Sequence, residues 1–191
     1  MQKKKKIIGV FALQGSFVEH QKMFKKLGAE VLLIRDLSDV ENKKLDGVIL
    51  PGGESTTIKQ LFKKTGLDKW LIEQGKKGLP IFGTCAGMIV LADLGLIDID
   101  VERNAYGSQL DSFEDEVFLK SGLHKSPDFR NKFPGIFIRA PKINRVGTKV
   151  KVLARHKKTP VLVRQNNVIV GSFHPELTDD LRIHKYLLEM K

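Results

Sequence analysis

The chain has 191 residues, enough for one well-buried core and too few for two ordinary domains, so we expect a single domain over residues 1–191. Hydrophobic residues make up 41% of the chain and charged residues 29%. No apolar run approaches the roughly 20 residues of a membrane-spanning helix, which argues against a membrane protein. The single cysteine excludes an internal disulfide and suits the reducing cytoplasm.

An excess of basic residues, 33 Lys and Arg against 22 Asp and Glu, gives a formal net charge of +11. Such a charge would suit a nucleic-acid-binding protein, whose clustered cations neutralise phosphates. Here the lysines are scattered over nearly every predicted loop and helix, and no nucleic-acid motif is recognised. We therefore expect a lysine-rich solvated surface and no nucleic-acid partner, while a basic face for an acidic protein partner stays open.

The first half of the chain alternates apolar runs with helical patterns. The runs predict strands at residues 7–13, 31–34 and 47–50, and a further buried strand at Ile81-Phe82 before Cys85. Helices are predicted at residues 17–27, around residues 58–62 and at residues 67–74. This order predicts an α/β fold of three layers, in which helices flank an open and mostly parallel sheet. In such a sheet the loops after the strands share one edge, so Gln14, Gly53 and Cys85 should lie together.

The second half is built from shorter apolar pieces. They lie at residues 98–103, 112–118, 135–138, 150–154, 161–163 and 168–173. Asn166-Asn167, between the last two pieces, is typical of a tight hairpin turn, so this half should be a mixed or antiparallel extension of the sheet. Residues 120–132 are polar and predict an exposed loop, and residues 178–190 predict a closing helix.

The motif Gly83-Thr84-Cys85-Ala86-Gly87 stands between a predicted strand and a predicted helix. Its spacing is that of the G-x-S-x-G nucleophile elbow with a thiol in place of the hydroxyl. There the flanking glycines permit a turn so sharp that the central side chain points outward. A small buried cysteine that packs as a hydrophobe is the competing interpretation. Because of the two flanking glycines, both interpretations of Cys85, as a nucleophile and as a buried apolar side chain, stay open.

A cysteine that attacks a carbonyl carbon needs a base and a group that orients the base. Among the five histidines, His174 alone directly follows a strongly apolar run, so it should lie at the same edge of the sheet as Cys85. Glu176 follows two residues later and could accept the other ring N–H. We predict that these three residues form the reacting group.

Three motifs, Pro51-Gly52-Gly53, the Cys85 elbow and His174-Pro175-Glu176, occur here in the order and spacing of class I, triad-type glutamine amidotransferases. Three further segments make the resemblance more specific than this general class, namely Leu13-Gln14-Gly15, Val101-Glu102-Arg103-Asn104 and Ile138-Arg139-Ala140-Pro141. With them, essentially the whole chain resembles the glutaminase subunits of pyridoxal 5'-phosphate synthases. One departure is the short connection over residues 91–101, which is often longer in that family and leaves the loop geometry open.

The resemblance implies hydrolysis of L-glutamine through a Cys85-His174-Glu176 triad and a thioester, without a metal or cofactor. It also implies that the ammonia passes to a synthase subunit, which makes pyridoxal 5'-phosphate from pentose and triose phosphates. The implied oxyanion hole is formed by the backbone N–H groups of Gly53 and Ala86. The residues that the resemblance places in the glutamine pocket are Gly53, Glu54, Ser55, Arg103, Ile138 and Arg139. It places Gln14 on the surface that faces the synthase subunit.

Taken without the resemblance, some of these residues have simpler interpretations. Arg103 and Arg139 could be surface charges, and Glu54-Ser55 could be a helix-capping turn. A glutaminase that serves another synthase, such as one for histidine or purine synthesis, and a non-catalytic module with Cys85 as a redox sensor also remain alternatives. We further expect the subunit alone to be a poor glutaminase until a partner orders the loop at Gly52-Gly53.

Overall fold

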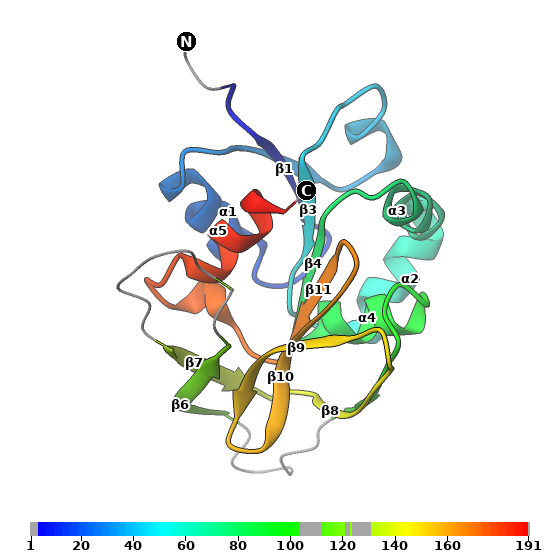
Figure 1. Ribbon diagram of the computed structural model, residues 1–191. Coiled ribbons are helices and arrows are strands. Elements are labelled where there is room, and N and C mark those ends of the chain that lie inside the picture. Colours follow the sequence, from blue (N-terminus) through cyan, green and yellow to red (C-terminus); the bar gives the residue numbers. More distant parts are fainter. Residues whose placement is uncertain (1–3, 104–111, 121–122, 124–130, 191) are drawn as a thin grey trace.

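The computed structural model describes residues 4–103, 112–120, 123 and 131–190 (Figure 1). Its main feature is a nine-stranded sheet in the order β2-β1-β3-β4-β11-β10-β9-β6-β7. The first five of these are parallel neighbours: β2 (Glu30–Ile34), β1 (Ile7–Phe11), β3 (Gly47–Leu50), β4 (Ile81–Thr84) and β11 (Val168–Gly171). We call these five strands the parallel half.

Helices cover both faces of the parallel half, as Figure 1 shows. One face packs against α1 (Phe17–Lys26) and α5 (Arg182–Glu189), and the other against α2 (Ser55–Thr65), α3 (Leu67–Lys76) and α4 (Ala86–Asp93). Strands β3, β4 and β11 are buried along their whole length, as continuous apolar runs require in a sheet covered on both sides. The predicted three-layer α/β fold is confirmed.

The remaining four strands of the sheet pair in antiparallel fashion, and we call them the antiparallel half. They are β10 (Thr159–Gln165), β9 (Lys151–His156), β6 (Ser112–Leu119) and β7 (Lys132–Ile138). The hairpin predicted at Asn166-Asn167 joins β10 to β11, where Gln165 pairs with Val168 and Asn166 has a φ of 52°. The predicted antiparallel extension is therefore present.

Some element boundaries differ from the sequence prediction. The first strand ends at Phe11 rather than at residue 13, and the closing helix α5 begins only at Arg182, after the short 3₁₀ helix η2 (Pro175–Leu177). A second 3₁₀ helix, η1, spans Leu37–Asp39. Most of the predicted loop at 120–132 lies outside the described residues.

A second, two-stranded sheet pairs β5 (Ile99–Glu102) with β8 (Lys142–Val146). Strand β8 was not predicted, because Ile143 is its one buried residue and it therefore lacks an apolar run. None of the helices in the described part of the chain is long and apolar enough to cross a membrane.

Candidate active site

Cys85 lies in the sharp turn between β4 and α4, and its backbone is strained. Its φ of 48° and ψ of −108° fall outside the regions that L-residues usually adopt. A Cβ at Gly87 would lie 2.1 Å from the Leu50 carbonyl oxygen, and one at Gly83 would lie 2.6 Å from a methyl group of Leu91. The flanking glycines are therefore sterically required. The turn has the geometry that the sequence predicted for a nucleophile elbow.

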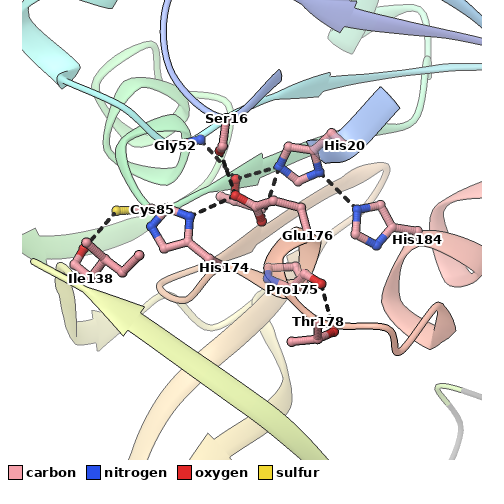
Figure 2. A network of polar contacts seen from close by, with 11 residues as sticks. Ser16, His20, Gly52, Cys85, Ile138, His174, Pro175, Glu176, Thr178 and His184 are labelled. Atoms are coloured by element: carbon pink, nitrogen blue, oxygen red, sulfur yellow. Dashed lines mark hydrogen bonds and ion pairs between the residues drawn. The ribbon is translucent and has the colours of Figure 1, made fainter. Parts of the chain in front are cut away.

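His174 and Glu176 follow β11 and lie next to the elbow. His174 Nδ1 is 2.7 Å from Glu176 Oε1, and Ser16 donates a hydrogen bond of 2.6 Å from its hydroxyl to the same oxygen. Figure 2 shows the sulfur of Cys85 and the carboxylate of Glu176 on opposite sides of the His174 ring. Gly52 fits against both Cys85 and His174: a Cβ there would lie 2.5 Å from His174 Cε1 and 3.2 Å from Cys85 Cβ.

The surroundings of this pair fix its charges. Burial alone would lower the pKa of His174, but its contacts with Cys85 and Glu176 outweigh burial and raise it to about 10. Burial alone would raise the pKa of Glu176, but its contacts with His20, His174 and Ser16 lower it to about 2. At neutral pH the two residues therefore form a buried imidazolium–carboxylate pair. The thiol of Cys85 contacts the Ile138 carbonyl oxygen at 3.8 Å.

The loop after β3 holds Gly53, whose N–H group is predicted to form one side of an oxyanion hole. The Gly52 carbonyl accepts a hydrogen bond of 3.2 Å from the Ser16 N–H, and the Gly52 N–H donates one of 3.1 Å to the Thr84 hydroxyl. Because the C=O and N–H of a trans peptide point in opposite directions, the Gly53 N–H faces away from Ser16. The Ala86 N–H is at the first turn of α4, where N–H groups have no partner inside the helix.

A pocket of about 590 Å³ opens in front of Cys85. It is lined by ten predicted site residues, namely Gln14, Gly53, Glu54, Ser55, Cys85, Ala86, Arg103, Ile138, Arg139 and His174. Glu176, which is buried, is the one predicted site residue that does not line it. Within the described residues, no three His, Cys, Asp or Glu side chains come together so as to hold a metal ion.

Glu54 lines this pocket but also caps helix α2. Its carboxylate accepts hydrogen bonds from the N–H groups of Thr56 and Thr57 at 3.0 and 2.6 Å and from the Thr57 hydroxyl at 2.7 Å. The Thr57 hydroxyl and these N–H groups lower the pKa of Glu54 to about 2. The Glu54 N–H donates to Gln14 Oε1 at 2.7 Å, so Gln14 holds the start of this turn. The Glu54 carboxylate is therefore the N-cap of α2, as the simpler interpretation of Glu54-Ser55 predicted.

The outer wall of the pocket carries two arginines. Arg139 directly follows β7 and has a φ of 43°, the second strained non-glycine residue at this pocket. Arg103 follows β5 and donates to Asp93 Oδ2 at 3.2 Å, which also accepts from Lys59. Ile138 is 38% exposed beside Arg139. Arg103 and Arg139 are themselves exposed, so both lie at the rim of the pocket and not in its interior.

Four residues of the polar network around the predicted triad were not predicted: Ser16, His20, Thr84 and His184. The sequence offers one signal for two of them. His20 is three residues after Phe17 and four before Phe24, on the apolar face of α1, and His184 lies on the apolar face of α5 beside Leu187. A histidine on a buried helix face needs a polar partner, but the spacing does not say which.

The comparisons with known proteins agree with one another. Residues 10–191 match the SNO glutamine amidotransferase family. The chain is 48% identical to the pyridoxal 5'-phosphate synthase subunit PdxT of Thermosipho africanus, with 96% of this chain and 97% of that protein covered. It is also 48% identical to PdxT of Fervidobacterium nodosum, with 96% of each covered.

Solved structures give the same picture. A crystal structure of a glutamine amidotransferase superposes with a TM-score of 0.86 at 44% identity and covers 95% of this chain and 97% of its own. The PurLQS structure from Thermotoga maritima has a TM-score of 0.73 at 16% identity, so its similarity to this chain is one of fold only. From the match over residues 10–191 and the identity to its relatives, this chain belongs to the SNO glutamine amidotransferase family.

Proposed function

We propose that this chain hydrolyses L-glutamine to glutamate and ammonia with Cys85, His174 and Glu176. The observation that carries the proposal is the strained Cys85 at the base of a pocket, beside an imidazole that is hydrogen-bonded to a buried carboxylate. Membership of a glutamine amidotransferase family names the substrate class. A second function is not favoured by any feature of the site.

The first half of the reaction breaks the amide bond. The Cys85 sulfur attacks as a thiolate at the side-chain carbonyl carbon of glutamine, and the carbonyl oxygen becomes an oxyanion, which the N–H groups of Gly53 and Ala86 stabilise. The C–N bond then breaks as His174 gives its proton to the departing nitrogen. The pKa of about 10 keeps His174 protonated for this step at neutral pH. Ammonia leaves and a glutamyl thioester remains.

The second half releases glutamate. A water molecule attacks the thioester carbon while His174, now neutral, takes its proton. The second tetrahedral intermediate collapses, the carbon–sulfur bond breaks and the Cys85 thiolate is regenerated. Glu176 accepts the His174 Nδ1–H at 2.7 Å throughout, so the ring keeps the same nitrogen toward the sulfur.

The remaining pocket residues suit a free amino acid. We propose that the guanidinium groups of Arg103 and Arg139 pair with the α-carboxylate of glutamine, because both lie at the rim and carry several donors. Glu54, Ser55 and the Ile138 backbone then face the rest of the zwitterion. No cofactor takes part in these steps.

The product determines the partner. Ammonia is mostly protonated in neutral water and is then no longer a nucleophile, so it must reach a second site directly. The relatives are subunits of pyridoxal 5'-phosphate synthase by name, and we propose that this chain delivers ammonia to the synthase subunit of that enzyme, with Gln14 at the interface. We also propose that residues 1–191 act as one domain in the cytoplasm, where the thiol stays reduced.

Glutamate release by this chain, measured with and without a pyridoxal 5'-phosphate synthase subunit, tests the proposal. We expect slow hydrolysis by the chain alone, faster hydrolysis in the complex and glutamine-dependent formation of pyridoxal 5'-phosphate. Equal rates would contradict the dependence on the partner. Stimulation only by a synthase of histidine or purine synthesis would assign a different partner.

Labelling separates the enzyme from the redox-sensor alternative. A glutamine-analogue electrophile should modify Cys85 stoichiometrically, and glutamine should block the modification because both occupy the same pocket. Labelling that glutamine does not slow would favour a reactive thiol without a glutamine site. The variant Cys85→Ala is the control, since it removes the only cysteine of the chain.

A further inference from the structure

Two buried histidines lie behind the reacting groups, and the proposed reaction does not use them. His20 of α1 and His184 of α5 are both 0% exposed, and His20 Nδ1 is 2.9 Å from His184 Nε2 (Figure 2). Burial is the main cause that lowers the pKa of both rings, so both are neutral at neutral pH. A neutral imidazole has one donor and one acceptor, so the direction of this contact depends on the tautomers.

The other nitrogen of His20 faces the catalytic carboxylate. His20 Nε2 is 3.1 Å from the Thr84 hydroxyl oxygen and 3.3 Å from Glu176 Oε2. Glu176 Oε1 is already engaged by His174 and Ser16, whereas the buried Oε2 makes no well-aligned hydrogen bond with any described residue. The edge of the His20 ring is therefore the polar group that meets the free side of this carboxylate.

Only one pair of tautomers suits these neighbours. With the proton on Nε2, the single N–H of His20 donates to the Thr84 hydroxyl, and its positive end lies next to Glu176 Oε2, which is 3.3 Å from the same nitrogen. His184 Nε2–H donates to His20 Nδ1. The Nδ1 of His184, which has no hydrogen-bond partner among the described residues, is then a bare acceptor. The opposite pair would turn a lone pair toward the Glu176 carboxylate and bury the N–H of His184 without an acceptor.

We propose that His20 is a positioning residue for glutamine hydrolysis: its Nε2–H, oriented by His184, holds Glu176 so that Oε1 stays directed at His174. The proposal rests on the proposed glutaminase function. The same ring also reaches the loop of the predicted oxyanion hole, because the Thr84 hydroxyl that it contacts accepts the Gly52 N–H at 3.1 Å. One buried side chain thereby connects the triad carboxylate with that loop.

Two substitutions of His20 distinguish positioning from simple core filling. Glutamine carries its amide nitrogen as many bonds from Cα as Nε2, so His20→Gln keeps a donor near Glu176, while His20→Leu removes it. In the complex with the synthase subunit, we expect His20→Leu to lower kcat for glutamine hydrolysis roughly 10- to 100-fold with KM unchanged. His20→Gln should recover most of that loss. A kcat of folded His20→Leu within twofold of wild type, or equal losses in both variants, would overturn the proposal.

The matched control is His156→Leu, which removes another buried histidine. His156 lies on β9 and is hydrogen-bonded to Asp115 at 2.8 Å, away from the His20 network. We expect this variant to lose stability and to keep the kcat of the wild type. If it loses as much kcat as His20→Leu, the effect belongs to general packing and the positioning role fails.

The alkaline limb of the pH profile gives a readout that core filling would not change. The charged and titratable groups near His20 are Glu176, His174, His184 and Glu19. A misplaced Glu176 holds the His174 proton less firmly, so in His20→Leu the fall in kcat at high pH should begin at lower pH than in the wild type. An unshifted limb would count against the proposal.

A measurement on the wild-type chain covers the case in which His20→Leu does not fold. Nitrogen-15 NMR of the histidine rings should show His20 protonated on Nε2 and bare on Nδ1. The reverse tautomer overturns the proposal. A wild-type complex that released no glutamate would instead refute the proposed function, and the NMR result would not change.

Discussion

The parallel and the antiparallel halves of the sheet contribute different kinds of groups to one pocket. Cys85 directly follows β4 and His174 comes three residues after β11, and both of these parallel strands are buried along their whole length. Ile138 and Arg139 stand at the end of β7, where buried and exposed residues alternate. The proposed reacting groups are thus fixed by buried strands, and part of the proposed glutamine-binding wall by a partly exposed strand. We expect substitutions in the first set to change kcat and those in the second to change KM.

The largest effect should come from the nucleophile. Cys85→Ala should reduce glutamine hydrolysis to background, a loss on the order of 10⁵-fold or more, because no other group can form the thioester. Alanine is small enough for the turn, so the melting temperature and binding to the synthase subunit should be preserved. His174→Asn should come close to the same loss. Glutamate release above background by Cys85→Ala would break the assignment of chemistry to the parallel half.

Glu176→Gln should have the next largest effect. It keeps the shape of the side chain but removes the charge that holds the His174 proton, and we expect kcat to fall on the order of 10³- to 10⁴-fold. KM for glutamine should change little, since Glu176 does not line the pocket. A rise in KM with unchanged kcat would mean that Glu176 acts on substrate binding instead. Steady-state kinetics of the complex measure both constants.

The same contrast explains what the sequence could predict. The prediction of Cys85 as nucleophile rests on two glycines and a strand-to-helix transition, and the prediction of His174 as its base rests on the apolar run before it. Both are local signals that place a residue at the end of a parallel strand. The glutamine-pocket residues depended on the family resemblance, because Arg103 and Arg139 alone look like surface charges.

The supporting network was not predictable in the same way. His20 and His184 are separated by 164 residues and meet only after α1 and α5 pack on one face of the sheet. A polar residue on an apolar helix face signals burial, but its partner depends on tertiary packing. Strand β8 was missed for a related reason: it is held mainly by pairing with β5 and has little apolar pattern of its own.

Substitutions on the outer wall should have a smaller effect, on binding rather than on chemistry. Arg139→Ala should raise KM for glutamine roughly 10- to 100-fold with kcat nearly unchanged, since it removes charge-assisted hydrogen bonds to the α-carboxylate. Arg103→Ala should raise KM less, because its guanidinium is already shared with Asp93. A large fall in kcat for Arg139→Ala would show that the antiparallel half also contributes to the chemical step and not only to glutamine binding.

The smallest expected effect is on the pH dependence of the unfolding free energy, which should differ between a buried carboxylate beside the parallel half and an exposed one on the antiparallel half. Burial opposes the charge of Glu176, but its contacts with His20, His174 and Ser16 lower its pKa from 4.5 to about 2. The folded state therefore binds fewer protons than the unfolded state, and this carboxylate contributes stability above pH 4.5 that disappears as pH falls toward 2. The difference in unfolding free energy between wild type and Glu176→Gln should accordingly shrink between pH 7 and pH 3.

Asp115 on β6 provides the comparison from the antiparallel half. Its pKa is also lowered, mainly by the hydrogen bond from His156, but its side chain is 43% exposed and solvent screens the interaction. Asp115→Asn should therefore change the unfolding free energy less than Glu176→Gln at pH 7, with a weaker dependence on pH. Urea unfolding midpoints at pH 7, 4 and 3 measure both differences. A larger pH dependence for Asp115→Asn than for Glu176→Gln would contradict this expectation, because the carboxylate with the more strongly lowered pKa would then lie on the antiparallel half.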